Sequence, residues 1–476
     1  MVTRFDLEVC RRVPLADAAL RLLDHVTDDD FLDDVFARHR GRSYEDVIRF
    51  PLLVHLIADA LLGHRGSAHQ TFRQAQEQGQ LEATVEAMYG KLRRIPIGLS
   101  QAFFAEATAR LASVLPRQAN PLPKSLAAFR VLNFDGKKIK HVAKKLKALR
   151  GLKGSVLGGK LLVVQDVGTG QALVAETTED GEASDNPLVP GAVAQARGLK
   201  DRRSRLWVGD RAFCDFTCLP LLAEGNDQFL VRYNARCAFV PDQQKPARTG
   251  KDKNRRKYRE EWGWLGKPNQ RKRLYVRRIT LFRTNDEPII LVTSLLDADG
   301  YAAVDLLTTS RRRWGIESMF LRVTQTINLR NLIGTTAPAT VFQAVFCLLL
   351  YNITLAIQGY VAAAAKRKPE TISQHLLFDE LARHMTAWCQ MLDPATTIKV
   401  RDATVLRTPQ DLKKYLQRAL SAVWTDRWIK APTRSRPPKG PPRAYLRGGH
   451  SSVAKILKGE HHELPIPRRH QQRQPK

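Results

Sequence analysis

The stretch Phe129-Arg-Val-Leu-Asn-Phe-Asp-Gly136 decides the fold class of this chain. Its aromatic and branched residues favour a β-strand, and an aspartate and a glycine end the apolar run. Two more apolar runs follow, Leu161–Gln165 and Ala172–Ala175, with Gly168-Thr-Gly170 as the turn between them. These segments predict three consecutive strands of one sheet.

Beyond this point, helical and strand patterns alternate along the chain. The next segments predict a helix, a strand, a helix and a strand, over Pro187–Leu199, Leu206–Val208, Phe213–Ala223 and Phe229–Tyr233. Three strands followed by helix, strand, helix and strand is the order expected of an RNase H-like α/β core with a mixed sheet. We therefore predict the α/β class.

The segments around this core differ from it in composition. Apolar spacings of three and four predict helices before the core, strand-like runs and many basic residues fill the segment after it, and Pro, Gly, Arg and Lys dominate the C-terminus. The predicted parts are helical residues 1–125, the first part of the core at 126–234, a β-rich basic insertion at 235–300, the second part of the core with C-terminal helices at 301–426, and a flexible or disordered basic tail at 427–476.

The charge balance indicates a polyanionic partner. The 476 residues include 77 Lys and Arg against 47 Asp and Glu, which gives a formal net charge of +30. Ribosomal, chromatin and membrane-surface proteins share such a balance, so charge favours a nucleic acid without naming a reaction. With 43% hydrophobic residues, the chain can bury a sizeable core and is not disordered as a whole.

Three other features narrow the class of protein. The six cysteines are scattered, and Cys214, Cys218 and Cys237 lack the CxxC or Cys/His pattern of a zinc site. The N-terminus has no apolar run after its basic residues, so we expect no signal peptide. Polar residues interrupt the most apolar stretch, Val341–Ala365, which favours a buried core helix over a membrane span.

Three acidic residues are candidates for catalysis in this basic chain. Asp135 and Asp210 each end an apolar strand-like run, and basic residues follow both of them. Carboxylates at such positions project from the carboxyl edge of a sheet, where α/β sites form. Glu317 lies in a helix predicted over Asp305–Asn328, shortly after three consecutive arginines. Any one of them alone would be interpreted as a cap or an ion-pair partner.

Phosphodiester chemistry explains why the three would occur together. Mg²⁺ prefers oxygen ligands, so a few carboxylates from different elements can hold it. Two such ions about 3.5–4 Å apart can activate an attacking oxygen and stabilise a leaving one. The spacing in the sequence does not by itself show that the three side chains converge.

Three blocks of the sequence resemble the catalytic blocks of DDE transposases. They are Asp135-Gly-Lys-Lys, Trp207-Val-Gly-Asp210-Arg-Ala-Phe and Arg311-Arg-Arg-Trp-Gly-Ile-Glu317-Ser-Met-Phe. The chain is most similar to the group named after insertion sequence four, whose signature is Tyr-x2-Arg-x3-Glu-x6-Lys. The resemblance implies that Asp135, Asp210 and Glu317 are catalytic and bind two Mg²⁺ ions, with Mn²⁺ as a substitute.

The resemblance also implies a reaction and its partners. A cut-and-paste transposase cleaves double-stranded DNA at terminal inverted repeats and joins the freed ends to target DNA, and a homodimer holds the two ends. Residues 1–125 would then recognise the inverted repeats, although a packing role explains their periodicity equally well. A bacterial protein of this kind is expected in the cytoplasm, associated with the nucleoid, and without a membrane partner.

The phosphate-binding part of the signature is met in part. Arg313 lies four residues before Glu317, as the arginine of the signature does. Ser310 takes the place of the tyrosine and Thr324 that of the lysine. The predicted DNA phosphate contacts are Arg211, Arg312, Arg313, Arg322, Lys137 and Lys138.

Three further residues have two interpretations each. Asp166 follows the second strand and is a rival metal ligand by position, but an aspartate before Gly-x-Gly is commonly a turn residue. Trp262 and Trp264 are candidates for stacking on an unpaired or flipped base. Packing inside the insertion is the commoner role for such tryptophans.

Other functions fit part of the same pattern. A non-catalytic DNA-binding protein derived from a transposase would explain Ser310 and Thr324, but retention of all three carboxylates argues against it. An RNase H-like nuclease would hydrolyse DNA without strand transfer, whereas the insertion and the N-terminal helices favour a transposase. A ribosome-associated basic protein would have no use for the carboxylates.

Overall fold

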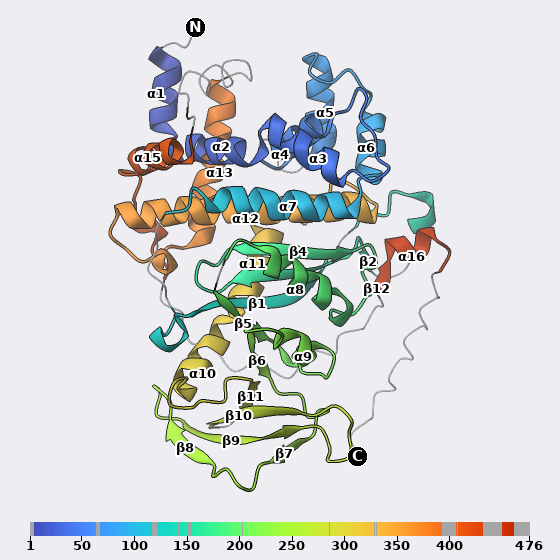
Figure 1. Cartoon of the computed structure of the whole chain (residues 1–476). Helices are drawn as coiled ribbons and strands as arrows, with labels where there is room; N and C mark the ends of the chain where they lie inside the picture. Colours follow the sequence, from blue (N-terminus) through green and yellow to red (C-terminus); the bar gives the residue numbers. More distant parts are fainter. Residues whose placement is uncertain are drawn as a thin grey trace, which may run out of the picture.

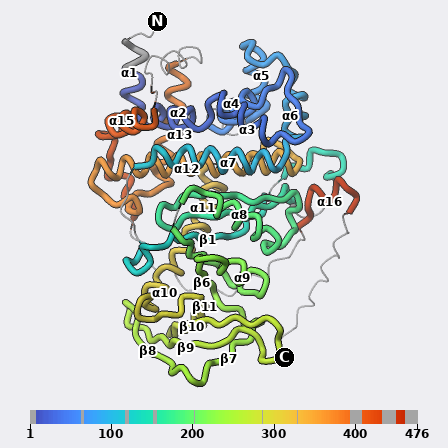
Figure 2. The backbone as a smooth tube through the Cα atoms, in the orientation of Figure 1, coloured from blue at the N-terminus to red at the C-terminus, as the bar shows by residue number. Residues whose placement is uncertain are grey.

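The computed structural model describes most of the chain. It covers residues 4–62, 67–116, 122–140, 142–150, 155–201, 203–284, 286–327, 329, 331–392, 406, 408–431 and 450–460. Figure 1 shows a layer of helices, a sheet beneath it, and further strands at the end of the sheet that is far from the helices. The trace in Figure 2 runs from the helices through the sheet and returns to the helices. The predicted α/β fold is confirmed.

A ten-stranded mixed sheet runs through the molecule, and five strands form its first half in the order β4, β3, β1, β5 and β6. They are β1 (Phe129–Lys138), β3 (Lys160–Asp166), β4 (Ala172–Thr178), β5 (Ser204–Gly209) and β6 (Gln228–Arg232). β1, β3 and β4 pair antiparallel, whereas β5 and β6 run parallel to β1. Helices α8 (Val189–Gly198) and α9 (Cys218–Leu222) connect β4 to β5 and β5 to β6, which is the predicted element order.

The first half of the sheet is buried on both faces. β3 is buried along its whole length, and its successive side chains face opposite sides. Leu161 and Val163 belong to the apolar cluster of the helical layer, whereas Leu162 and Val164 pack with α8 and α9. This burial explains the unbroken apolar run that predicted the strand.

The predicted β-rich insertion continues the same sheet. Its strands are β7 (Phe239–Pro241), β8 (Arg248–Lys251), β9 (Lys257–Leu265), β10 (Leu274–Arg283) and β11 (Asp286–Thr293). β11 pairs antiparallel with β6, with Val292 opposite Val231. Backbone hydrogen bonds therefore join the insertion to the core, and the two are parts of one sheet.

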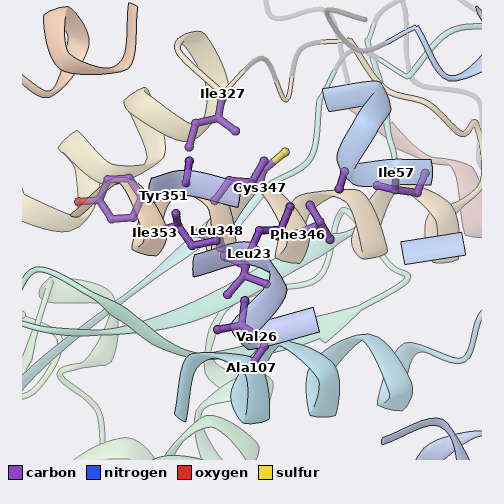
Figure 3. Close-up of a cluster of buried hydrophobic side chains, with 14 of the residues drawn as sticks. Leu23, Val26, Ile57, Ala107, Ile327, Phe346, Cys347, Leu348, Tyr351 and Ile353 are labelled. Carbon is purple, nitrogen blue, oxygen red and sulfur yellow. The ribbon is translucent and has the colours of Figure 1, made fainter. Parts of the chain in front are cut away.

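The N-terminal helices pack with the C-terminal helices in one layer (Figure 1). The N-terminal set is α1 (Arg4–Arg12), α2 (Pro14–Thr27), α3 (Asp29–His39), α4 (Phe50–Leu62), α5 (Ala68–Glu77), α6 (Val85–Arg93) and α7 (Ile97–Ala112). The C-terminal set is α12 (Ala337–Ala364), α13 (Gln374–Met391) and α15 (Pro409–Ala419). Figure 3 shows part of their shared core, with Leu23 of α2, Ile57 of α4 and Ala107 of α7 around Cys347 of α12. The described helices before residue 125 thus share one apolar core with the C-terminal helices.

Helix α12 is central to that layer. It is long and apolar enough to cross a membrane, but 94% of its most apolar window is buried inside the protein, as predicted for a core helix. Its Asn352 faces the edge strand β4. The Asn352 Oδ1 atom accepts from the Ala172 N–H at 3.0 Å, and its Nδ2 donates to the Ala172 carbonyl oxygen at 2.7 Å. This side chain fixes the helix to the edge of the sheet.

Part of the predicted flexible tail, 427–476, is ordered. Residues His450–Ser452 form β12, which pairs parallel with β2 (Ser155–Leu157), and α16 (Val453–Leu457) follows it. Val453 is completely buried in a small apolar cluster beside β2. The tail prediction was wrong for this segment because a few apolar residues interrupt a composition otherwise rich in Pro, Gly, Arg and Lys.

Candidate active site

Asp135 and Asp210 each follow the last paired position of two neighbouring parallel strands, β1 and β5. The paired register of β1 and β5 ends at Asn133 and Val208, and the two aspartates are each two residues further along. β1 itself continues to Lys138, so Asp135 lies inside this strand and not at its end as predicted. The strand continues because β3 supplies pairing partners after β5 has ended.

Burial and charge set the protonation of Asp135. Burial raises the pKa of Asp135 to about 6, while the Gly136 N–H and the Arg313 guanidinium act against this shift. The negative charges of Asp185 and Glu317 act in the same direction as burial. The Gly136 N–H donates to Asp135 Oδ1 at 2.8 Å. Asp135 is therefore within electrostatic reach of one cation and two carboxylates.

Asp210 follows β5 directly and precedes a short 3-10 turn, Arg211–Phe213. Its carbonyl oxygen accepts from the Phe213 N–H at 3.1 Å, which turns the chain away from the sheet. Within the described part of the chain, nothing hydrogen-bonds to its buried Oδ1 atom. Such an oxygen is costly to bury, so it favours the approach of a donor or a cation.

Two helices meet at Arg313 and bring Glu317 towards Asp135. The helix expected over Asp305–Asn328 is broken there into α10 (Ala303–Arg312) and α11 (Trp314–Gln325). The Asn133 side chain of β1 donates to the Arg313 carbonyl oxygen at 3.2 Å, which fixes the break against the sheet. α11 packs on β1 and carries Glu317 in its first turn.

Arg313 lies between two of the acidic residues. Its Nη2 atom is 3.2 Å from Glu317 Oε1, and its Nη1 atom is 4.0 Å from Asp135 Oδ2. Arg313 is only 8% exposed, so its charge is largely removed from water. The separation of four residues on a helix explains the pairing with Glu317, and β1 supplies the second carboxylate.

A fourth carboxylate lies close by, and sequence analysis did not identify it. Asp185 pairs with the buried Lys160 of β3, with 2.7 Å between Lys160 Nζ and Asp185 Oδ1. A Cβ atom at Gly136 would come within 1.8 Å of the same Oδ1 atom, so any other residue at this position would displace the Asp185 carboxylate. No local pattern marks Asp185, because its partners come from distant strands.

The three consecutive arginines before Glu317 have three different environments. Arg311 Nη2 lies 2.9 Å from Asp252 Oδ2, at the β8–β9 turn of the insertion. Although burial acts in the opposite direction, hydrogen bonds from Arg256 and Arg311 hold the pKa of Asp252 well below its usual range. Arg312 is exposed, and Arg313 lies among the carboxylates. Only Arg312 of the three is free to contact DNA without breaking an ion pair.

The other predicted phosphate contacts are not grouped together. Lys137 Nζ lies 5.5 Å from the centre of the Phe320 ring of α11, on the side of β1 that carries Asp135, and burial lowers its pKa. Lys138 points to the other face of the strand. Arg211 is exposed beside Asp210. Arg322 lies apart from these residues, in a hollow against α12 and α13.

The two positions that depart from the family signature have local backbone roles. Thr324 Oγ1 donates to the Phe320 carbonyl oxygen at 2.6 Å within α11. The Ser310 carbonyl oxygen accepts from the Arg313 N–H at 3.2 Å at the helix break. Neither side chain offers a positive charge to a phosphate.

Trp262 is not available for base stacking in this structure. It is 2% exposed, its indole N–H donates to the Leu296 carbonyl oxygen at 2.9 Å, and Lys245 Nζ lies 4.6 Å from its ring centre. The strand is covered at this position, so packing explains the residue. Trp264 is 39% exposed and packs edge-on against Tyr275, so stacking stays a prediction for Trp264 alone.

Neither Asp166 nor the cysteines are suited to bind a metal ion in this structure. Asp166 Oδ1 accepts from the N–H groups of Gly168 and Thr169 at 2.8 and 3.1 Å, and an arginine pairs with its other oxygen, as expected of a turn residue. Cys214 and Cys218 are buried free thiols, and burial raises the pKa of both to about 12. These thiols are far from the thiolate form that binds metals.

The carboxylates fit a divalent metal ion, although they do not form a closed site. Within the described part of the chain, no three Asp, Glu, His or Cys side chains are placed to hold an ion together. The donors are nevertheless of the kind that Mg²⁺ and Mn²⁺ prefer, and Asp210 Oδ1 has no partner there. A guanidinium cation already lies between Asp135 and Glu317. These three acidic residues are the ones that would hold a metal.

Comparison with known proteins indicates the class to which this arrangement belongs. Residues 130–353 match the model of a family described as "Transposase DDE domain". The matched segment is just under half of the chain and contains Asp135, Asp210 and Glu317. The match supports a DDE transposase.

One solved structure is similar to this chain. It is described as "Cryo-EM structure of piggyBac transposase synaptic complex with hairpin DNA (SNHP)". The likeness covers 86% of this chain and 85% of that chain, with 10% sequence identity and a TM-score of 0.42. No curated protein matches the chain.

Proposed function

We propose that this protein is a DNA transposase that cleaves DNA at inverted-repeat ends and transfers the freed ends into target DNA by a cut-and-paste reaction. Asp135, Asp210 and Glu317 would be the catalytic residues and would bind two Mg²⁺ ions, for which Mn²⁺ can substitute. The register of β1 and β5 is the observation that carries this proposal. Asp135 and Asp210 each come two residues after the last paired position of these strands, and α11 packs on β1 with Glu317 in its first turn.

The site would serve two successive attacks on phosphorus. Water attacks first and frees a 3′ hydroxyl, and this hydroxyl then attacks target DNA. Bound metal ions would activate each attacking oxygen and stabilise the leaving one. Strand pairing fixes Asp135, whereas Glu317 depends on the packing of α11 and on the Asn133–Arg313 hydrogen bond. No protein nucleophile is needed, because water and DNA supply both attacking oxygens.

Positive side chains would hold the DNA around the carboxylates. Arg211 and Arg312 are exposed near the site, and Lys137 shares the Asp135 side of β1. The exposed basic residues of the β8–β9 hairpin would hold flanking or target DNA. They are Lys251, Lys253, Arg255, Lys257 and Arg259.

The proposal extends to the assembly. The N-terminal helices would recognise the inverted repeats, and a homodimer would hold two ends of double-stranded DNA. Assignment to the insertion-sequence-four group rests on the three sequence blocks and Arg313, because Ser310 and Thr324 depart from its signature. Such a bacterial protein would act on the nucleoid in the cytoplasm.

A plasmid assay tests this function. A supercoiled plasmid that carries the gene with its flanking DNA is incubated with the full-length protein and Mg²⁺ or Mn²⁺. The wild-type protein should nick and linearise it and join its ends to a second plasmid. Asp135→Asn and Glu317→Gln should do neither while still shifting the DNA in a gel.

Asp215→Asn is the matched control. Asp215 accepts the N–H groups of Thr217 and Cys218 as a helix cap, and asparagine can fill that role, so cleavage should persist. Cleavage that survives in Asp135→Asn or Glu317→Gln would sink the assignment. Nicking without joining would favour an RNase H-like nuclease, and DNA binding without cleavage would favour a non-catalytic derivative.

A further inference from the structure

We infer that Arg313 is an internal counter-cation that occupies the position of a divalent ion between Asp135 and Glu317 and leaves it when the ion binds. The inference rests on the proposed function, because it takes the two carboxylates as metal ligands. It adds that the Arg313 guanidinium competes with the metal ion for the two carboxylates, and that this competition sets the metal affinity of the site.

The contacts of the guanidinium carry this inference. Within the described part of the chain, the ion-pair partners of Arg313 are Glu317, at 3.2 Å from Nη2, and Asp135, at 4.0 Å from Nη1. The two contacts use the two terminal nitrogens, so the planar group spans the gap between β1 and α11. Only 10% of the Arg313 side chain is exposed.

This arrangement differs from an ordinary ion pair on a helix surface. Arg12 and Glu8 form such a pair, with 75% and 45% of their side chains exposed, and pairs of that kind contribute little. In the Arg313–Glu317 pair the carboxylate is 39% exposed but the arginine side chain is only 10% exposed, and the Asn133 side chain of the sheet donates to the Arg313 carbonyl oxygen. The sheet therefore sets the position of this cation.

Electrostatics explains why a cation lies here. Neighbouring carboxylates repel each other, and a positive charge between them relieves the repulsion. A divalent ion would do the same with twice the charge and with the same oxygens, Asp135 Oδ2 and Glu317 Oε1. The ion and the guanidinium cannot occupy one place, so the binding of one displaces the other.

Displacement would couple metal binding to DNA binding. The released guanidinium would lie beside the metal, where the scissile phosphate must bind, and guanidinium groups pair strongly with phosphate oxygens. Because such coupling is reciprocal, DNA that accepts Arg313 would tighten metal binding, and metal would tighten DNA binding. The protein without DNA would then hold metal weakly.

Mn²⁺ binding to the full-length protein without DNA tests the inference, with free Mn²⁺ measured by electron paramagnetic resonance. Arg313→Gln removes the competing cation and should lower the Kd for Mn²⁺ about tenfold, the size of one charge-assisted hydrogen bond. Arg312→Gln is the matched control, since it removes the same charge from the adjacent exposed position. Its Kd should change by less than about twofold, because salt screens exposed charges. Cleavage by Arg313→Gln should fall although its metal binds more tightly.

Mn²⁺ binding that is no tighter in Arg313→Gln than in Arg312→Gln would overturn the inference. Asp135→Asn separates this outcome from a failure of the proposed function. If Asp135→Asn leaves Mn²⁺ binding unchanged, the proposed metal site is wrong. If it weakens Mn²⁺ binding while the two arginine variants agree, only the counter-cation is wrong.

A second variant covers the case in which circular dichroism shows Arg313→Gln to be unfolded. Arg313→Lys keeps the charge, but an ammonium group cannot span both carboxylates as the guanidinium does. Its Kd for Mn²⁺ should be lower than that of the wild-type protein, and an unchanged Kd contradicts the inference.

Discussion

The two halves of the sheet are built differently although backbone hydrogen bonds join them. In the half formed by β4, β3, β1, β5 and β6, apolar side chains meet helices on both faces. In the insertion half, ion pairs between β9 and β10 replace part of the apolar packing, as in Arg277–Glu260 and Arg278–Glu261. One half partly buries a few carboxylates, and the other presents many cations to solvent.

The difference shows how a strongly basic protein can combine a carboxylate site with the DNA-binding surface that we propose for the insertion. The β6–β11 pairing keeps the cationic half at a fixed position relative to the carboxylates. The Arg311–Asp252 ion pair is a second tie, between the β8–β9 turn and the break before α11. DNA held on the insertion would therefore be held at a fixed distance from Glu317.

Asp135→Asn should have the largest effect and should separate activity from stability. Loss of a metal ligand is expected to lower cleavage at least about a thousandfold. The same change should raise the Tm of the metal-free protein by a few degrees at pH 7.5, because burial raises the pKa of Asp135 to about 6 and the folded wild-type protein carries the cost of that buried charge.

The sign of this stability effect follows from the two pKa values. Above about pH 6 the carboxylate is ionised in both the folded and the unfolded state, whereas below its ordinary pKa of about 3.9 it is protonated in both. The Tm advantage of Asp135→Asn should therefore shrink as pH falls from 6 towards 4. Thermal unfolding followed at several pH values measures it, and a lower Tm for the variant at pH 7.5 would contradict the prediction.

Glu260→Gln should be the most destabilising change in the insertion half. The Arg277 side chain is completely buried and that of Glu260 is 6% exposed, so the variant leaves a buried guanidinium without its partner. A loss of about 3–5 kcal/mol in the free energy of unfolding is expected in denaturant titration. Asp286→Asn removes a carboxylate that is 57% exposed and should cost less than about 1 kcal/mol. Equal losses would mean that ion pairs do not hold this half together.

Replacing both Lys253 and Lys257 by glutamine should weaken DNA binding without changing the rate of cleavage at saturating DNA. Both side chains are exposed at the β8–β9 hairpin. The slope of log K against log salt should become shallower by about 0.9 for each phosphate that the variant no longer neutralises. Lys366 and Lys368, exposed beyond α12, provide the control for an equal change in net charge. A reduced maximal rate would place the insertion in the chemistry itself.

Arg311→Gln should have the smallest effect and should test the tie between the two halves. The ion pair with Asp252 is partly exposed on the arginine side, so its loss should cost about 1 kcal/mol or less, or up to about fivefold in the cleavage rate. The Kd for DNA should stay as in the wild-type protein. Arg312→Gln should instead raise the Kd for DNA and leave the cleavage rate at saturating DNA unchanged. If the two variants behave identically, neither the Arg311–Asp252 ion pair nor the exposed Arg312 acts as described.

Local pattern was sufficient for the strands and helices of the fold but not for their pairing. The apolar run of β3 was predictable because both faces of that strand are buried. The attachment of β11 to β6 was not, because no local signal states which distant strand is the partner. The β12–α16 segment was missed for the same reason, because its few apolar residues become buried only through contact with β2.

A site residue could be predicted from the sequence when the pattern of its own strand or helix marks it, but not when distant residues position it. Asp135 and Asp210 follow from strand patterns, whereas Glu317 needed the resemblance to transposases. Asp185 escaped because Gly136 and Lys160, which position it, are distant in sequence. The stacking prediction for Trp262 was wrong because Leu296 and Lys245, from other segments, contact its ring.

The amide of Asn352 also helps to protect the edge of the sheet at β4. An uncovered edge strand can recruit strands from other molecules and start aggregation. At β4 the amide satisfies the N–H and the carbonyl of Ala172 as a neighbouring strand would, and α7 and α12 pack on the same strand. The strands of the insertion lie at the opposite side of the core, beyond β6. One asparagine thus takes the place of a neighbouring strand at the first residue of β4.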